Sequence, residues 1–334
     1  MKKYNLILLL VVALFASCME EPIVEPNTNM GNFESLWRII DTKYCYLDYK
    51  QINWDSIYTA YKAKITEKAD AFVFFDLMGI MLNELKDGHV NLYSNFDRSR
   101  YWKWYTDYPA NFNVNLIHSA RYLGNNYKIA NGLSYQKIAN GRVGYIYLGS
   151  FSYGFNDANI VSALNYFKDC KGLIIDVRNN SGGSLDYSRQ LTSCFFKEEK
   201  VTGYIKHKIG NGHTDFSKAL EVKTPAHKYI QYLRQVVVLT NRMSFSATND
   251  FVNRMKQAPN VLVVGDKTGG GGGLPLSSEL PNGWLVRFSS SPMFDSDMQN
   301  IEWGIEPDVR ESLKSYDQLN DIDTIIEKAI TLIK

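Results

Sequence analysis

The sequence predicts an α/β protein with a helical N-terminal subdomain, and three observations support this prediction. The chain has 334 residues of ordinary globular composition, 45% apolar and 22% charged, which is enough for one large domain or two modest ones. Apolar residues recur at helical spacing from Asn32 to Leu85. From Val143 onward, strands that are apolar almost throughout alternate with helical segments, which is typical of a sheet covered on both faces.

The first 17 residues have the pattern of a secretory signal. Lys2 and Lys3 precede the apolar run Leu6–Ala16, which is too short to span a membrane as a helix. The run ends in Phe15-Ala16-Ser17-Cys18, which resembles the bacterial lipobox except that Phe15 stands where leucine is usual. We therefore expect lipid modification of Cys18, with residues 18–31 as a flexible tether rich in Pro, Asn and Glu. The alternative is an ordinary signal peptide that happens to contain a cysteine.

Charge and ligand spacing exclude several classes of function. Removal of the leader takes away two lysines and leaves 35 basic and 35 acidic residues, so composition gives no support for nucleic-acid binding. The five histidines show neither HxxH nor HExxH spacing, and we expect no metal site and no cofactor. Cys45, Cys170 and Cys194 could form one disulfide or remain buried free thiols.

The pattern divides the rest of the chain into three regions. Residues 32–89 are expected to form three helices separated by Asp- and Asn-containing turns. Residues 90–142 are expected to form a short β region of strands and hairpins, including alternation over residues 111–116 and a turn at Asn140-Gly141. Residues 143–334 form the α/β core, which ends in a helix near 319–333.

Three junctions between strands and helices could carry chemistry, because catalytic groups of open α/β sheets gather there. In Arg178–Gly183, adjacent glycines allow backbone N–H groups to point at an anion. In Thr240–Thr248, Ser244 or Ser246 could be a nucleophile or simply a helix N-cap. The glycine run 269–273 lacks the Gly-Lys-Ser/Thr ending and the following helix of a phosphate-binding loop, so we exclude nucleotide binding.

Five motifs occur in an order that makes a specific combination: Leu85–His89, Gly172–Gly183, Ser246–Asn249, Val264–Gly269 and Glu302–Asp308. Together they resemble the S41 serine peptidases, the tail-specific or C-terminal-processing group with its tricorn-like and retinoid-binding-protein-like branch. The resemblance covers most of residues 32–334 and implies a ClpP/crotonase-like core. The segment 90–142 is too short for the complete PDZ module that the processing peptidases carry.

The resemblance also implies a set of site residues. Ser246 is the nucleophile, Glu302 is the acidic partner, and the oxyanion N–H groups are those of Ala247 and of Gly182 or Gly183. The lysine base of the processing branch falls at Gly271, and Lys267 is four residues early, so the tricorn-like base His89 is expected instead. We expect an apparent pKa of about 6–7.5 for this histidine.

One residue departs from the tricorn-like pattern, and it affects how Glu302 could reach the histidine. A serine just before the histidine bridges the acid to it in that branch, but this chain has Gly88. The sequence thus predicts an exported, lipid-anchored serine peptidase acting on peptides or unfolded protein tails. It would be held in a bacterial cell envelope, on the periplasmic face or at the surface of the outer membrane. The alternative is a non-catalytic ligand- or peptide-binding protein on the same fold.

Overall fold

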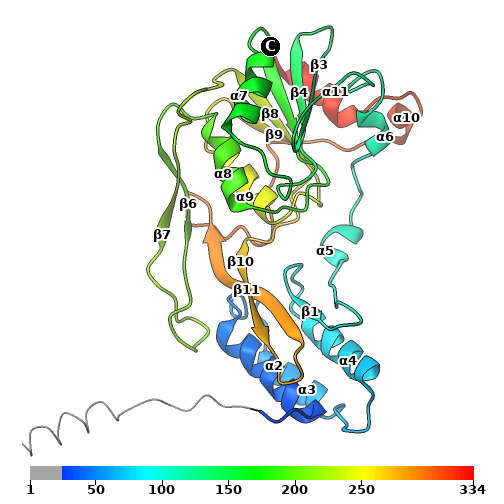
Figure 1. Ribbon diagram of the computed structural model, residues 1–334, viewed down its shortest axis with the longest axis vertical. Coiled ribbons are helices and arrows are strands. Elements are labelled where there is room, and N and C mark those ends of the chain that lie inside the picture. The colour runs from blue at the N-terminus through cyan, green and yellow to red at the C-terminus, as the bar shows by residue number, and fades with distance from the viewer. Residues whose placement is uncertain (1–24) are drawn as a thin grey trace, which may run out of the picture.

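The structure, a computed structural model, describes residues 25–334 and divides into two lobes (Figure 1). The expected leader, residues 1–17, and the lipidation site Cys18 lie outside the described residues. One lobe is built on an α/β sheet, and the other combines the N-terminal helices with a long hairpin (Figure 1). The prediction of a mixed α/β fold with a helical N-terminal part is confirmed.

The core sheet has seven strands in the order β12-β9-β8-β5-β4-β3-β2. Within this sheet, neighbouring strands among β4, β5, β8, β9 and β12 pair in parallel, whereas the β2–β3 and β3–β4 pairs are antiparallel. Their bounds are β2 (Lys128–Ala130), β3 (Leu133–Ile138), β4 (Val143–Tyr147), β5 (Gly172–Asp176), β8 (Gln235–Thr240), β9 (Val261–Gly265) and β12 (Val309–Arg310).

Both faces of this sheet are buried, which explains why its central strands are apolar throughout. On β5, Leu173 and Ile175 face a cluster with α7 (Asp157–Tyr166), α8 (Leu185–Ser193) and α9 (Ala247–Met255). Ile174 points the other way, into a cluster with α6 (Val114–Ile117) and α11 (Thr324–Leu332). The short helix α10 (Ser315–Gln318) precedes α11.

The second lobe packs α2 (Asn29–Lys43), α3 (Trp54–Lys62) and α4 (Ala71–Asn83) against the inner face of a second sheet. Side chains of Thr28, Asn53 and Asp70 accept hydrogen bonds from first-turn N–H groups and so fix where these helices begin. The sheet runs β1-β11-β6-β7, with β10 also paired to β11. Its strands are β1 (Asn91–Tyr93), β6 (Lys200–Ile205), β7 (Leu220–Thr224), β10 (Gly273–Glu279) and β11 (Leu285–Phe294).

Three boundaries differ from the sequence-based expectation. Helix α2 begins at Asn29, inside the expected tether, because Thr28 caps it and the buried Gly31 packs in its first turn. The segment 111–116, expected as strand, contains the short helix α6 instead, capped by Asn113. Residues 90–142 are not one unit, since β1 joins the helical lobe while β2 and β3 join the core sheet.

Two properties of the described residues bear on the remaining expectations. Cys45, Cys170 and Cys194 are free and buried, so the disulfide considered from the sequence is not formed. Within residues 25–334, no helix has the length and apolar character needed to cross a bilayer.

Candidate active site

Ser246 lies at the sharp turn between strand β8 and helix α9. Its backbone has φ 60° and ψ −119°, a region in which residues other than glycine are strained. Its N–H donates to Gly270 O at 2.9 Å, which holds the turn, but its side chain caps no helical N–H. The half-buried hydroxyl is therefore not used as a helix cap, and it lies 2.9 Å from Nε2 of His89.

Ser244, the other hydroxyl considered from the sequence, has a structural role. Its Oγ donates to Val177 O at 2.9 Å and accepts from Asn241 N at 3.1 Å, and the residue is fully buried. These bonds tie the turn after β8 to the end of β5. The two serines thus differ: Ser244 is bound to backbone groups, whereas Ser246 lies within hydrogen-bond distance of a histidine.

His89 reaches Ser246 from the other lobe, in the loop between α4 and β1. Its backbone N–H donates to Asp87 Oδ1 at 2.8 Å, which fixes the loop. Its ring packs against Phe245 at 4.8 Å between centroids and is only 2% exposed. Burial lowers the pKa of His89 to about 4, aided by the positive charges of Arg287 and Lys50 and opposed by Asp87. This value replaces the expected 6–7.5, since that range assumed a solvated imidazole.

Glu302 does not contact His89. Its Oε1 pairs with Lys50 Nζ at 2.7 Å and its Oε2 accepts from Gly272 N at 3.0 Å. Nδ1 of His89 has no hydrogen-bond partner among the described residues. The sequence left open whether Glu302 reaches His89 in the absence of a bridging serine; in the structure its carboxylate pairs with Lys50 instead.

Lys50, which sequence reasoning missed, links two buried acids. Its Nζ lies 2.7 Å from Glu302 and 3.5 Å from Asp87 Oδ2, which also accepts from the hydroxyls of Tyr44 and Ser289. Burial and the negative charge of Asp87 raise the pKa of Glu302 to about 8, while Lys50 opposes this. Asp87 could have been noticed from its place two residues before the histidine, but nothing in the local sequence marks Lys50.

The predicted oxyanion groups lie beside Ser246, with one correction. The N–H of Gly182 donates to Asn180 Oδ1 at 3.0 Å and is not available to a substrate. The N–H groups of Gly183 and Ala247 donate to no other described residue, as expected for Ala247 at the first position of a helix. Asn180 O accepts from Phe245 N, which holds the two turns together. The site thus offers two free donors beside the serine.

An aromatic stack lies against the two glycines that stand where the resemblance places a lysine base and a bridging serine. Phe245 stacks on Trp104 at 4.2 Å between centroids. A Cβ added at Gly271, the expected place of a lysine base, would lie 2.5 Å from the Phe245 ring. A Cβ at Gly88, where a bridging serine was expected, would lie 2.7 Å from the Trp104 indole nitrogen. Glycine at both positions is thus matched to this stack. Lys267 pairs with Glu306 instead.

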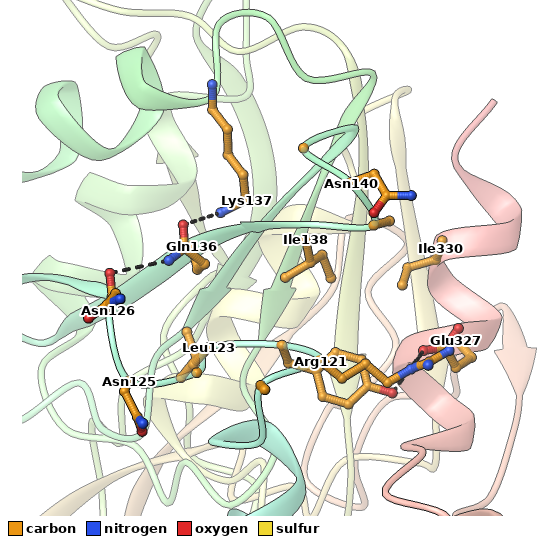
Figure 2. A pocket seen from close by; sticks show the side chains of 15 residues that line it. Arg121, Leu123, Asn125, Asn126, Gln136, Lys137, Ile138, Asn140, Glu327 and Ile330 are labelled. Carbon is orange, nitrogen blue, oxygen red and sulfur yellow. Dashed lines mark hydrogen bonds and ion pairs between the residues drawn. The ribbon is translucent and has the colours of Figure 1, made fainter.

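A cavity of about 290 Å³ opens at the Ser246–His89 pair. Its walls combine aromatic side chains, arginines and the Gly183 backbone, and they come from both lobes. A separate cavity of about 750 Å³ lies beside β3 and α11, between segments 120–126 and 136–141 (Figure 2). There Glu327 is already paired with Arg121 at 2.7 Å, and none of the candidate catalytic residues lines it. Within residues 25–334, no cluster of three or more His, Cys, Asp or Glu residues could hold a metal.

Comparison with known proteins relates this two-lobed α/β chain to peptidases. Residues 142–311 match peptidase family S41, and residues 26–83 match the C1 domain of tricorn protease. A crystal structure of a candidate peptidase from Parabacteroides merdae ATCC 43184 is 49% identical with a TM-score of 0.89, covering 92% of this chain and 97% of that one. The chain belongs to peptidase family S41.

More distant relatives agree with this membership. The carboxy-terminal processing protease CtpA of Bacillus subtilis (strain 168) is 26% identical over 192 residues, 57% of this chain and 39% of the relative. A CtpA-like protein of Staphylococcus aureus (strain COL) is 28% identical over 184 residues, 54% and 36% respectively. The chain thus spans less than half the length of these curated relatives. Mature CPAF, crystallised with lactacystin, shares the fold at 13% identity, with a TM-score of 0.68 over 92% of this chain.

Proposed function

We propose that this chain is a serine peptidase that cleaves peptides or unfolded protein tails with Ser246 as nucleophile and His89 as general base. The observation that carries the proposal is the 2.9 Å separation between His89 Nε2 and Ser246 Oγ at a strained strand-to-helix turn. A hydroxyl is a weak nucleophile until a neighbouring base takes its proton. A histidine whose pKa is lowered to about 4 is neutral at ordinary pH and can accept that proton.

In the proposed reaction, the Ser246 hydroxyl donates its proton to Nε2 of His89 while Oγ attacks the scissile carbonyl carbon. The carbonyl oxygen becomes an oxyanion that accepts hydrogen bonds from the N–H groups of Gly183 and Ala247. His89 then returns the proton to the leaving amine, which departs and leaves an acyl-serine. A water molecule then donates a proton to His89 and attacks the ester carbon. His89 passes this proton to Oγ as the bond between Oγ and the acyl carbon breaks, which releases the acid product and restores the Ser246 hydroxyl.

Labelling with a fluorophosphonate probe tests this function without a known substrate. The wild type is expected to be labelled, and Ser246→Ala and His89→Ala to lose labelling while keeping wild-type circular dichroism. Ser244→Ala is the matched control and is expected to remain reactive. A folded wild-type protein that resists the probe would contradict the proposal. It would favour the alternative of a non-catalytic binding protein. The loss of activity would then be explained by the lack of a hydrogen-bond partner for His89 Nδ1, which leaves the imidazole without an orienting group.

We further propose that the protein is exported and anchored by lipid at Cys18 in a bacterial cell envelope. The support is the basic and apolar leader, the Phe15-Ala16-Ser17-Cys18 sequence and the polar segment that follows it. Metabolic labelling with a radioactive fatty acid should mark the wild type but not Cys18→Ala, which should also leave the membrane fraction. A wild type that takes up no label would contradict the anchor but not the peptidase.

A further inference from the structure

The cavity beside Ser246 carries an excess of positive charge. Three arginines line it, namely Arg98, Arg100 and Arg287, and no carboxylate is among the described residues of its wall. Arg100 is compensated, because its guanidinium pairs with Asp97 at 3.2 Å. For Arg98 and Arg287, the described part of the chain contains no carboxylate within ion-pair distance and no acceptor of a guanidinium hydrogen bond. The cavity therefore presents two uncompensated cations next to the reactive hydroxyl.

Arg287 is held in the cavity wall by the register of the second sheet. It lies opposite Asn91 in the β1–β11 pairing, and its neighbours Val286 and Phe288 are buried in the core of the helical lobe. Because side chains alternate along a strand, Arg287 projects to the other face, toward the cavity. It is half-buried, so its charge is only partly hydrated. A guanidinium in such a place binds a carboxylate strongly and can do so through two hydrogen bonds.

Arg98 and the aromatic residues complete a site of suitable size. Arg98 is exposed, lies over the Tyr93 ring at 5.8 Å and is bridged to Tyr93 through the backbone. Tyr101, Trp102 and Trp104 provide apolar walls. The volume of about 290 Å³ is at the lower end of ligand cavities, which suits one side chain or a chain end rather than a larger ligand.

We propose that Arg287, assisted by Arg98, binds a carboxylate of the substrate, so that the enzyme prefers peptides with a negative charge close to the scissile bond. This inference rests on the proposed peptidase function. The carboxylate belongs either to an Asp or Glu side chain or to the C-terminus of the peptide. In both cases the guanidinium fixes the substrate while its neighbouring carbonyl lies near Ser246, which would favour reaction by orientation.

The test uses matched peptides that differ by one charge. One pair has Glu or Gln beside the scissile bond, and a second pair has a free or an amidated C-terminus. For the wild type we expect kcat/KM at least tenfold higher for the charged member of one pair, and the pair that discriminates identifies the source of the carboxylate. Arg287→Gln should reduce the preference to less than threefold, and Arg287→Lys should restore part of it. Arg121→Gln, which removes an equal charge far from Ser246, should keep the wild-type preference.

Two outcomes would overturn the inference: a wild type that cleaves both members of each pair equally, or an Arg287→Gln enzyme that keeps the full preference. Fluorophosphonate labelling of the same variants separates this from failure of the peptidase itself. If the wild type is not labelled, carboxylate recognition is still measurable as binding of the fluorescent peptides to Ser246→Ala protein. Tighter binding of the charged peptide, lost in Ser246→Ala/Arg287→Gln, would support the site, and equal binding would refute it.

Discussion

We expect activity to be lost only as the pH falls to about 4, because His89, the proposed general base, is buried. The solvated reference pKa of histidine is about 6.5, and burial lowers the pKa of His89 to about 4. A tenfold change in proton affinity is worth about 1.36 kcal/mol, so the buried site disfavours the imidazolium by roughly 3 kcal/mol. The rate constant for fluorophosphonate labelling should therefore be level above about pH 5 and half-maximal near pH 4.

The same burial makes a prediction about stability. Between about pH 6.5 and 4 the unfolded chain protonates this histidine and the folded chain does not. The contribution to the free energy of unfolding is thus complete above about pH 6.5 and is lost, by up to roughly 3 kcal/mol, as the pH falls toward 4. Circular dichroism at each pH, and recovery of labelling on return to pH 7.5, distinguish protonation from unfolding. A labelling midpoint between pH 6 and 7.5 in folded protein would refute the reasoning, since it would require a hydrated imidazole.

Three further substitutions test other parts of the site. Lys50→Met should lower the free energy of unfolding by about 3–5 kcal/mol in urea denaturation, because two buried acids lose their cation. Adding Glu302→Gln should recover part of this loss. A Lys50→Met variant with wild-type stability would contradict the pairing. Arg287→Gln should move the acid midpoint of labelling to higher pH, since its positive charge lowers the pKa of His89; an unchanged or lower midpoint would disagree. Ser244→Ala should lower the free energy of unfolding by about 1–3 kcal/mol, because it leaves buried backbone groups unpaired, but the variant should still be labelled. Complete loss of labelling would show that Ser246 is not the nucleophile.

The fold class and the main elements of the core could be predicted because their signals are local. The strands β5, β8 and β9 are continuous apolar runs, and helix α9 begins at the turn where Ser246 was expected. The segment 111–116 was predicted wrongly for the same reason. Its alternating Asn and apolar residues suit a strand, but Asn113 caps a short helix that places Leu116 and Ile117 in the core.

The site was only partly predictable because its ion pairs join distant segments. The motifs named Ser246 and His89, and the structure brings them within hydrogen-bond distance. The motifs could not show that Lys50 would form an ion pair with Glu302. The two residues are 252 positions apart, and their contact depends on how the two lobes meet. The choice between Gly182 and Gly183 also required the structure, because the Asn180 side chain decides which N–H remains free.

Under the proposed mechanism, the separation of Ser246 and His89 between two lobes makes family membership and catalytic competence independent properties. His89 lies outside both matched segments, 26–83 and 142–311, whereas Ser246 and the oxyanion donors lie inside the second. A homologue can therefore keep every matched residue, including the strained serine, while losing the proposed base through one substitution in the loop before β1. Such a chain would retain the cleft and its arginines but would hold peptides without cutting them. Under the proposed mechanism, one residue outside the two matched segments separates an active peptidase from a peptide-binding protein.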